Sequence, residues 1–313
     1  MDEFALIEQF FAGRGVCRDD VLLGIGDDAA ITRSDSGFEL VIATDTICAG
    51  THFLPGTPPR ALGHRCLAVN LSDLAAMGAE PLWCTLALSL PEAEPCWVQQ
   101  FADGFFAIAD RFGMALVGGD TVRGPLAMTV TVHGRVKPGR AIRRNGAQEG
   151  DSIYITGVPG QAAAGLRVLA ASGMTAEAGA RPVQRFLYPE PRVMEGLALN
   201  GLATAMIDVS DGLIADVPRL LEASRLGAQM ELANLPLAAV GTDDALELAL
   251  NGGDDYELCF CVSPGNAAEL ELRAADWNCP VTRIGTVQRS ADIVWLVDGQ
   301  LYNAVPGQFK HFS

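Results

Sequence analysis

The sequence predicts an α+β protein in which two α/β domains are each built on a mixed sheet. Three observations lead to this prediction. The chain has 313 residues, 49% of them hydrophobic, and a chain of this length usually forms more than one hydrophobic core. Apolar runs with helix and strand periods follow one another without a strict βαβ rhythm. A polar stretch rich in Gly and Arg, residues 137–151, separates the two halves.

The N-terminal half starts with a short amphipathic helix and continues with helices and strands in turn. Gly78 and Pro81 end its longest helix, and Pro81 and Pro91 bound the strand that follows. We predict helices over residues 4–11, 61–77 and 95–112, a turn-rich segment over 21–31, and strands over 38–44, 82–90, 114–117 and 127–136.

The C-terminal half begins with a strand, a turn containing Gly and Pro, and an Ala-rich helix. β-prone runs then recur between helical stretches up to the end of the chain. We predict strands over residues 152–156, 229–232, 256–262, 282–287 and 293–297, and helices over 192–202 and 212–225. The domain boundary is placed between residues 137 and 138.

The charge of the chain limits its partners. The formal net charge is −16 and the pI is about 4.6. A protein this acidic repels nucleic acid backbones and anionic membrane surfaces, so we expect neither as a partner. An anionic substrate would need its repulsion neutralised, and divalent cations held by carboxylates are the simplest means.

Cysteine usage and the lack of long apolar runs predict a cytoplasmic protein. The eight cysteines form no CxxC pair and most lie in apolar runs, which favours free thiols over disulfides or a zinc site. Residues 1–8 contain no apolar run of signal length. No segment reaches the roughly 18 apolar residues that a membrane helix needs.

Aspartates recur where glycine-rich turns meet the predicted ends of strands. Asp45 and Asp120 each follow an apolar strand and precede a threonine, which adds a second oxygen. A short carboxylate at a strand end can hold a hard cation, and glycine lets the backbone approach a ligand closely. The pattern predicts Mg²⁺ bound beside phosphates. Further candidates are Asp28, Asp73, Asp208, Asp211, Asp254 and Asp255.

A turn role is the alternative for each of these aspartates, because Asp often bonds to the backbone of its own turn. It is the favoured interpretation for Asp27, Asp243 and Asp244. Ser210 or Asp211 could instead cap the helix that follows them.

Motifs of the common phosphate-binding and hydrolytic sites are absent from the sequence. There is no GxxxxGK[ST], no HRD or DFG set and no GxSxG. Of the four histidines, His52 is the one that we place in a site, because it lies near Asp45. A histidine in a surface loop is the alternative. Nothing in the pattern supports Cys48 as a nucleophile.

Seven segments, taken in order, resemble the thiamine-monophosphate kinase family of the aminoimidazole ribonucleotide synthetase-like superfamily. They are IGDDAA (25–30), ATDT (43–46), AGTHF (49–53), AVNLSDLAAMGAEP (68–81), GGDT (118–121), IDVSDGL (207–213) and GGDDYEL (252–258). The resemblance runs from about residue 4 to residue 312. It implies a homodimer, with an N-terminal domain (1–137) that binds ATP and Mg²⁺ and dimerises, a C-terminal α/β domain (138–313), and ATP bound without a P-loop.

The resemblance also implies roles for single residues. The implied Mg²⁺ ligands are Asp28, Thr44, Asp45, Thr46, Asp73, Asp120, Asp208 and Asp211. The implied ATP contacts are Gly119, Asp120, Arg144 and Ser210, although a solvated linker arginine is the alternative for Arg144. The implied substrate contacts are His52, Asp254 and Phe309. The family usually has Glu where this chain has Asp254, and often a Trp near the C-terminus, where Phe309 stands here.

The activity that the resemblance implies is a thiamine-phosphate kinase. ATP would phosphorylate thiamine monophosphate to thiamine diphosphate by direct in-line transfer, with several Mg²⁺ ions and no protein nucleophile. One alternative is another enzyme of the superfamily, such as a selenophosphate synthetase or an aminoimidazole ribonucleotide synthetase. Another is a non-catalytic acidic protein that binds metal or nucleotide.

Overall fold

Two sheets organise the chain, one in each of two structural units. The computed structural model describes residues 3–174, 180–238, 244–305 and 307. The N-terminal unit runs to residue 139, except that residues 75–78 group with the C-terminal unit. The predicted α+β class is confirmed, since each sheet mixes parallel and antiparallel neighbours. The division at residues 137 and 138, with the role given to each side, stays a proposal.

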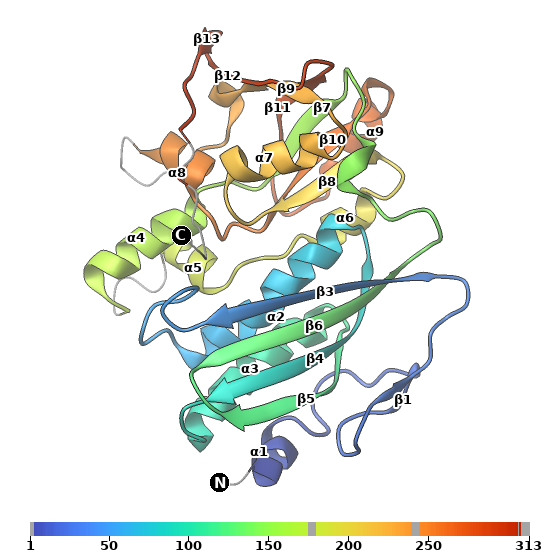
Figure 1. Ribbon diagram of the computed structural model, residues 1–313, viewed down its shortest axis with the longest axis vertical. Coiled ribbons are helices and arrows are strands. Elements are labelled where there is room, and N and C mark those ends of the chain that lie inside the picture. The colour runs from blue at the N-terminus through green and yellow to red at the C-terminus, as the bar shows by residue number, and fades with distance from the viewer. Residues whose placement is uncertain (1–2, 175–179, 239–243, 306, 308–313) are drawn as a thin grey trace. The chain divides into compact units, whose positions relative to one another are not determined.

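The sheet of the N-terminal unit has four strands in the order β3-β6-β4-β5 (Figure 1). They are β3 (Glu39–Cys48), β4 (Glu80–Leu90), β5 (Ala115–Arg123) and β6 (Ala127–Val136). β4 and β5 run parallel, and the other neighbours are antiparallel. The unit also contains α1 (Glu3–Phe10) and a two-stranded pair, β1 (Val21–Leu23) with β2 (Ile31–Thr32). β1 and the start of β2 lie within residues 21–31, which were predicted as a turn-rich segment.

Two helices, α2 (Pro59–Ala76) and α3 (Pro95–Arg111), cover one face of this sheet (Figure 1). The Glu94 carboxylate accepts two backbone N–H groups of the first turn of α3 and so fixes where the helix begins. A Cβ on Gly104 of α3 would lie 1.9 Å from the Arg60 carbonyl oxygen of α2. Glycine at this position therefore lets the two helices pack closely.

Two strands are longer than the sequence predicted, and this changes the place of two candidate aspartates. The prediction that Asp45 and Asp120 stand at strand ends is wrong. β3 continues past Asp45 to Cys48, because all ten of its residues pair with β6. β5 continues past Asp120 to Arg123, because it pairs with β4 again after a register shift beyond Cys84. Both aspartates are therefore strand residues.

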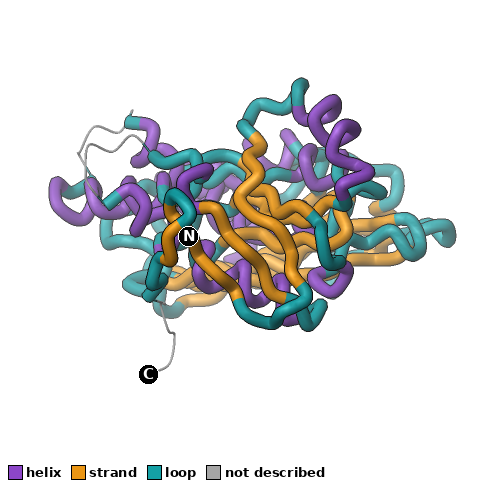
Figure 2. Tube along the Cα trace, turned by 90° about the horizontal axis from the view of Figure 1, so that it is seen from above, coloured by secondary structure: helices purple, strands orange, loops and turns teal. Residues whose placement is uncertain are grey.

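The sheet of the C-terminal unit has seven strands in the order β13-β12-β9-β11-β7-β10-β8. They are β7 (Ser152–Thr156), β8 (Ala203–Val209), β9 (Gly227–Glu231), β10 (Glu257–Val262), β11 (Val281–Gln288), β12 (Ile293–Val297) and β13 (Gln300–Leu301). Neighbouring strands run side by side in Figure 2, where strands are orange. The interior strand β7 pairs with β10 and β11, which lie far from it in the sequence.

Helix α7 (Leu213–Glu222) packs on this sheet through one apolar side. Leu213, Val217 and Leu220 are fully buried and recur at helical spacing. They join a core with residues of the strands, such as Ile155 and Cys259. The sequence periodicity of this segment therefore reflects a real buried face.

The remaining helices of the C-terminal unit are short. They are α4 (Gln161–Ser172), α5 (Arg181–Leu187), α6 (Val193–Ala198), α8 (Ala245–Asn251) and α9 (Ala267–Ala274), with 3-10 turns η1 (Arg144–Gly146), η2 (Leu232–Asn234) and η3 (Pro264–Asn266). The predicted helix over 192–202 is too long, because the backbone turns at Gly201, where φ is 79°.

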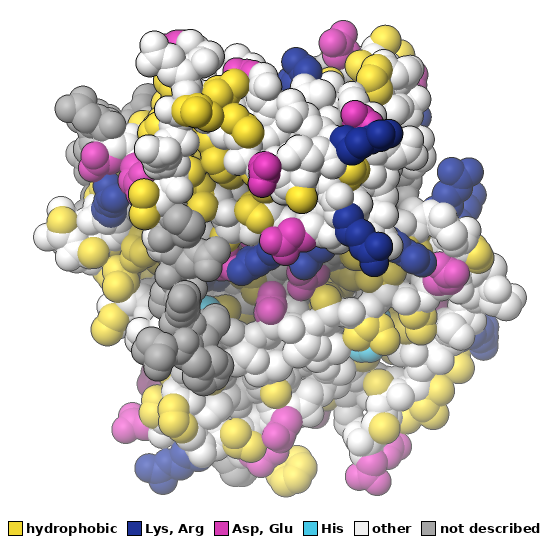
Figure 3. Space-filling model, turned by 45° about the horizontal axis from the view of Figure 1, so that its top comes forward, with side chains coloured by type: hydrophobic (Ala, Val, Ile, Leu, Met, Phe, Trp, Pro, Cys, Tyr) yellow, Lys and Arg dark blue, Asp and Glu magenta, His cyan; other side chains and the backbone are white. Residues whose placement is uncertain are grey.

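The thiol groups of the cysteines are free, and the surface carries both acidic and basic side chains. All eight cysteines are free and five of them are buried, so the expectation of free thiols is confirmed. Acidic (magenta) and basic (dark blue) side chains are interspersed on the face drawn in Figure 3. None of the helices in the described ranges is long and apolar enough to span a membrane.

Candidate active site

A cavity of about 580 Å³ in the N-terminal unit gathers three of the predicted site residues, Asp28, Gly119 and Asp120. One side of it is the turn 24–30, and another is the stretch 116–121 of β5. Its apolar lining includes Phe4, Ile7 and Phe11. The cavity therefore places carboxylate oxygens next to apolar surface, an arrangement suited to a polar ligand with an aromatic part.

The two aspartates of the turn between β1 and β2 both line the cavity. The backbone N–H of Asp28 donates to the Asp27 carboxylate at 2.8 Å. Asp27 thus has the turn role that was expected of it.

Asp45 is held at its backbone by Asn70, a buried side chain of α2. The Asp45 N–H donates to Asn70 Oδ1, and Asn70 Nδ2 donates to the Cys66 carbonyl oxygen, both at 2.9 Å. Asp73 follows Asn70 by three residues and so lies on the same side of α2. Desolvation raises the pKa of the Asp45 carboxyl, and the charge of His52 acts in the opposite direction.

The hydroxyl groups of Thr44 and Thr46 bond across the sheet. Thr44 pairs with Thr131 at 2.9 Å and Thr46 with Thr129 at 2.8 Å. Because side chains alternate along a strand, both lie on the face opposite the Asp45 side chain. The structure therefore does not bring these two hydroxyls together with the Asp45 carboxylate.

The imidazole of His52 is oriented by the backbone of its own turn. Its Nδ1 accepts the N–H of Cys48 at 3.1 Å. A ring nitrogen that accepts a hydrogen bond carries no proton, so in the neutral ring the proton is on Nε2. His52 can therefore donate a hydrogen bond through Nε2.

In the C-terminal unit, the turn after β8 is organised by Asp216, a buried residue of α7. Asp216 Oδ2 accepts the backbone N–H groups of Ser210 at 3.0 Å and Asp211 at 2.9 Å. Arg219 donates to Asp216 Oδ1 at 2.7 Å and to Asp211 Oδ2 at 2.5 Å. Asp208, at the end of β8, is buried next to this turn.

The capping alternative for Ser210 and Asp211 is wrong. The residue that precedes α7 is Gly212, and no side chain caps the helix. Instead, the side chain of Asp216 accepts hydrogen bonds from the backbone N–H groups of Ser210 and Asp211, in the turn before the helix. Burial raises the pKa of the Asp216 carboxyl to about 6, while its hydrogen bond from Asp211 opposes the shift.

Asp254 belongs to a loop that is hydrogen-bonded to the same turn. Its N–H donates to the Ser210 carbonyl oxygen at 2.8 Å. The hydroxyl of Tyr256 donates to Asp254 Oδ1 at 3.1 Å. The structure thus brings together Ser210, implied as an ATP contact, and Asp254, implied as a substrate contact.

Of the two remaining predicted residues, the structure describes Arg144 but not Phe309. Arg144 is exposed in η1, and the Ser224 hydroxyl donates to its carbonyl oxygen at 3.3 Å. Phe309 lies outside the described residues.

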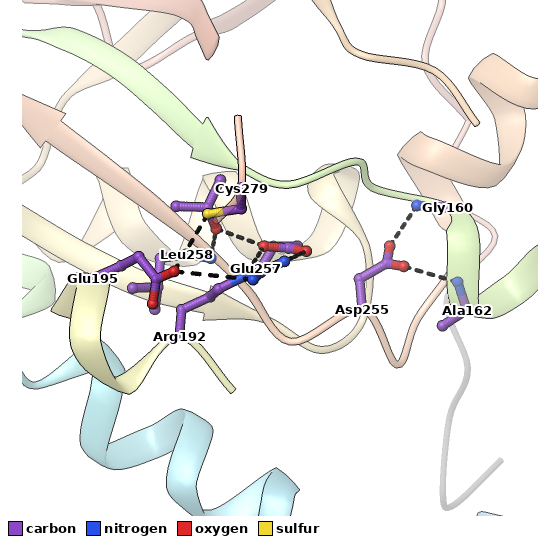
Figure 4. Close-up of polar contacts among 9 residues, drawn as sticks. Gly160, Ala162, Arg192, Glu195, Asp255, Glu257, Leu258 and Cys279 are labelled. Atoms are coloured by element: carbon purple, nitrogen blue, oxygen red, sulfur yellow. Dashed lines mark hydrogen bonds and ion pairs between the residues drawn. The ribbon is translucent and has the colours of Figure 1, made fainter. Parts of the chain in front are cut away.

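A buried ion pair lies at the start of β10 (Figure 4). Arg192 donates from Nε and Nη2 to the Glu257 carboxylate at 2.6 and 2.5 Å, and both side chains are 4% exposed. Burial disfavours the charge on Arg192, but the hydrogen bonds and charge of Glu257 outweigh it and raise the pKa of Arg192. Thr156 of β7 donates to the same carboxylate at 2.7 Å.

The sequence prediction missed the residues that hold the candidate residues in place. Asn70, Asp216, Arg219 and Tyr256 fall in this group. The i, i+3 spacing of Asp216 and Arg219 on a predicted helix was a usable signal. Nothing in the sequence marked Asn70 as the partner of Asp45, because this contact joins a helix to a strand 25 residues away.

The chemistry of these groups fits magnesium, although the described residues form no closed metal cage. Within the described ranges, no cluster of three or more His, Cys, Asp or Glu side chains is placed to hold a metal ion. Mg²⁺ often takes just one or two carboxylates together with substrate phosphates and waters. The carboxylates of Asp28 and Asp120 in one cavity supply such hard oxygen ligands.

Family models identify the class of protein that has this fold and this cavity. Residues 26–136 match the N-terminal domain of AIR synthase related proteins, and residues 148–297 match their C-terminal domain. Together the two matches span most of the chain, so the chain belongs to the class of two-domain AIR synthase related proteins.

Individual relatives narrow this class. The chain is 47% identical to the thiamine-monophosphate kinase of Escherichia coli (strain K12), over 99% of this chain and 98% of the relative. The crystal structure of thiamine-monophosphate kinase from Stenotrophomonas maltophilia K279a has a TM-score of 0.87 and 44% identity, covering 96% and 98% of the two chains. A structure described as AaThiL complexed with AMPPCP and TMP has a TM-score of 0.78 and 30% identity, covering 92% of each chain.

The chain therefore belongs to the thiamine-monophosphate kinase family. The expectation of an enzyme, a thiamine-phosphate kinase, is confirmed, and the other superfamily enzymes and the non-catalytic binding protein are set aside.

Proposed function

We propose that this chain transfers the γ-phosphoryl group of ATP to thiamine monophosphate by a direct in-line reaction assisted by several Mg²⁺ ions. Family membership supports the two substrates, and AMPPCP and TMP are the molecules bound in the structure of one relative. The observation that carries the proposal is the cavity that gathers Asp28, Gly119 and Asp120 beside an apolar wall.

The proposed roles divide the site residues into three groups. The first group, mostly carboxylates, holds Mg²⁺, which when bound would neutralise charge on the phosphates. Gly119, Arg144 and Ser210 contact ATP, and Arg144 suits this role because a guanidinium can grip phosphate oxygens in a fork. His52, Asp254 and Phe309 contact the acceptor. The proposed Mg²⁺ ligands are Asp28, Thr44, Asp45, Thr46, Asp73, Asp120, Asp208 and Asp211.

In the proposed reaction, a phosphate oxygen of thiamine monophosphate forms a bond to the γ-phosphorus while the bond to the ADP oxygen breaks on the opposite side. A phosphate monoester is largely ionised at neutral pH, so no protein base is needed. The residues of the chain act by holding both substrates in line. No protein nucleophile takes part.

A homodimer and a cytoplasmic location complete the proposal. α2 and α3 cover one face of the N-terminal sheet, and on the edge strand β3 Leu40 and Ile42 are 47% and 60% exposed. Apolar side chains on an edge strand favour a second copy of the chain that covers them.

Eight free thiols are typical of a reducing compartment. The acidic charge supports the absence of nucleic acid and membrane partners.

An assay of ADP release tests the substrates and the metal. ADP should form rapidly when ATP, Mg²⁺ and thiamine monophosphate are all present, and hardly at all when the acceptor is left out or EDTA is added. ADP formation that does not depend on thiamine monophosphate would contradict the proposal.

The stereochemistry of transfer tests the in-line step. With ATP made chiral at the γ-phosphorus by oxygen isotopes and sulfur, one direct transfer should invert the configuration. Retention would require two successive transfers and therefore a covalent phosphoryl-enzyme intermediate.

A further inference from the structure

The loop before β10 has a backbone that is rare for its residue types. Asp254 and Tyr256 have φ angles of 69° and 52°, in the left-handed region. A bulky residue such as Tyr seldom adopts this region. Such conformations persist where the surrounding contacts hold the backbone in place, and they are common at functional sites.

Backbone hydrogen bonds fix this loop to the turn after β8. Asp254 N–H donates to the Ser210 carbonyl oxygen at 2.8 Å, and Tyr256 N–H donates to the Val209 carbonyl oxygen at 2.9 Å. The two residues with left-handed backbone are thus each tied to the segment that carries Ser210.

The residue between them supplies a further anchor (Figure 4). Asp255 is 7% exposed, and its carboxylate accepts the N–H groups of Gly160 at 2.5 Å and Ala162 at 3.0 Å. These N–H groups belong to the start of α4. The loop is therefore attached on one side to β8 and on the other to α4.

This fixed backbone brings two side chains of the loop together. The Tyr256 hydroxyl donates to Asp254 Oδ1 at 3.1 Å, and both side chains are partly buried. A hydrogen bond to an ionised acceptor is strong and directional, so it restricts the rotation of the Asp254 carboxylate.

We infer that Tyr256 is a positioning residue that holds the Asp254 carboxylate in the orientation that receives the acceptor. This inference rests on the proposed function. Thiamine monophosphate offers a permanently cationic thiazolium ring and an aminopyrimidine N–H donor, and a carboxylate of fixed direction recognises either one. Because Asp254 is short, its reach depends on the backbone and on Tyr256. Tyr256 thereby contributes to the choice of acceptor.

The test removes the hydroxyl and the carboxylate separately and together. Tyr256→Phe keeps the ring, and Asp254→Gly removes the side chain at a φ that glycine adopts readily. We expect Tyr256→Phe to raise the KM for thiamine monophosphate about five- to tenfold, with the KM for ATP, kcat and Tm little changed. In the Asp254→Gly background, the same substitution should have no further effect.

Tyr154→Phe is the matched control, because Tyr154 lies in β7 of the same sheet and stacks on Phe260. It should leave both KM values as in the wild type. Independent, multiplying effects of Tyr256→Phe and Asp254→Gly, or equal changes in both KM values with a lower Tm, would overturn the inference and leave the kinase proposal intact. A wild-type protein that does not phosphorylate thiamine monophosphate would overturn both.

Discussion

Asp45 and Asp120 illustrate how a carboxylate is presented from inside a strand. Asp45 has its N–H bound by Asn70, and Asp120 follows two glycines in β5 and lines the cavity. Both lie on the ordered backbone of a sheet, which limits their movement. A rigid element positions a ligand-binding side chain more accurately than a loop does.

We expect Asp45→Asn and Asp120→Asn each to reduce turnover at least about a hundredfold while the fold is retained, because each removes a charge where phosphates are bound. Steady-state rates at limiting and saturating Mg²⁺, with circular dichroism as the check on folding, measure this. Asp276→Asn, at an exposed position after α9, is the control. Near-normal turnover at limiting Mg²⁺ would remove that residue from the set of metal ligands.

The buried Asp255 predicts how stability depends on pH. Desolvation raises its pKa to about 8, although the N–H groups of Gly160 and Ala162 oppose the shift. In the unfolded chain an Asp has a pKa of about 3.9. The folded state therefore keeps a proton that the unfolded state has lost, and the contribution of Asp255 to stability falls as pH rises from about 4 to about 8.

Urea unfolding of the wild type and Asp255→Asn at pH 6 and pH 8 tests this, because Asp216, whose pKa is about 6, is present in both proteins and its contribution cancels in the comparison. The wild type should lose about 2 kcal/mol more of its free energy of unfolding between these pH values than Asp255→Asn does. Equal losses would show that Asp255 is ionised in the folded protein throughout the interval.

At the scale of elements, the sequence predicted most helices and strands, but the ends of only a few. β6, β7 and β12 were predicted to the residue, since alternation or an apolar run bounded by turn residues marks them. The predicted ranges of β3 and β5 ended too early. Asp and Gly are poor strand formers, and only pairing with β6 and β4 extends these strands. Helices α8 and α9 are short and were missed.

The candidate site shows the same division. Motifs pointed to Asp28 and Asp120, and the fold places both at one cavity. The role of Asn70 depends on a contact that forms only when α2 and β3 meet, and no local sequence pattern contains that information. Asp216 differs, because its contacts to Ser210 and Asp211 are local and its i, i+3 spacing to Arg219 was a usable signal.

Gly119 links the geometry of β5 to the cavity and allows a matched test. A Cβ at Gly119 would lie 1.9 Å from the Leu86 carbonyl oxygen of β4, whereas a Cβ at Gly118 would meet nothing within 4 Å. We expect Gly119→Ala to lower the free energy of unfolding by about 2 kcal/mol or more, because the strands must move apart. Gly118→Ala should change it much less in the same urea titration. Equal effects would contradict the steric explanation.

For the whole molecule, the central expectation is a homodimer formed through the N-terminal sheet. Light scattering at micromolar concentration should give twice the mass of one chain. Ile42→Lys, on the exposed side of β3, should shift the protein toward monomer, because it places a charge in an apolar contact. Leu272→Lys is the control, since Leu272 is 70% exposed in α9. A monomeric wild type, or equal effects of the two variants, would contradict this interface.

The strand order of the C-terminal sheet has a consequence for synthesis on the ribosome. β7 is made early, yet its neighbours β10 and β11 begin about 100 and about 125 residues later, which at about 5–20 residues per second is a wait of roughly 5–25 seconds. During that time the apolar side chains of β7, including Ile153 and Ile155, have no strand to pair with. The nascent chain is therefore exposed to aggregation until residue 288 has emerged, and holdase chaperones that bind extended apolar segments should raise its yield.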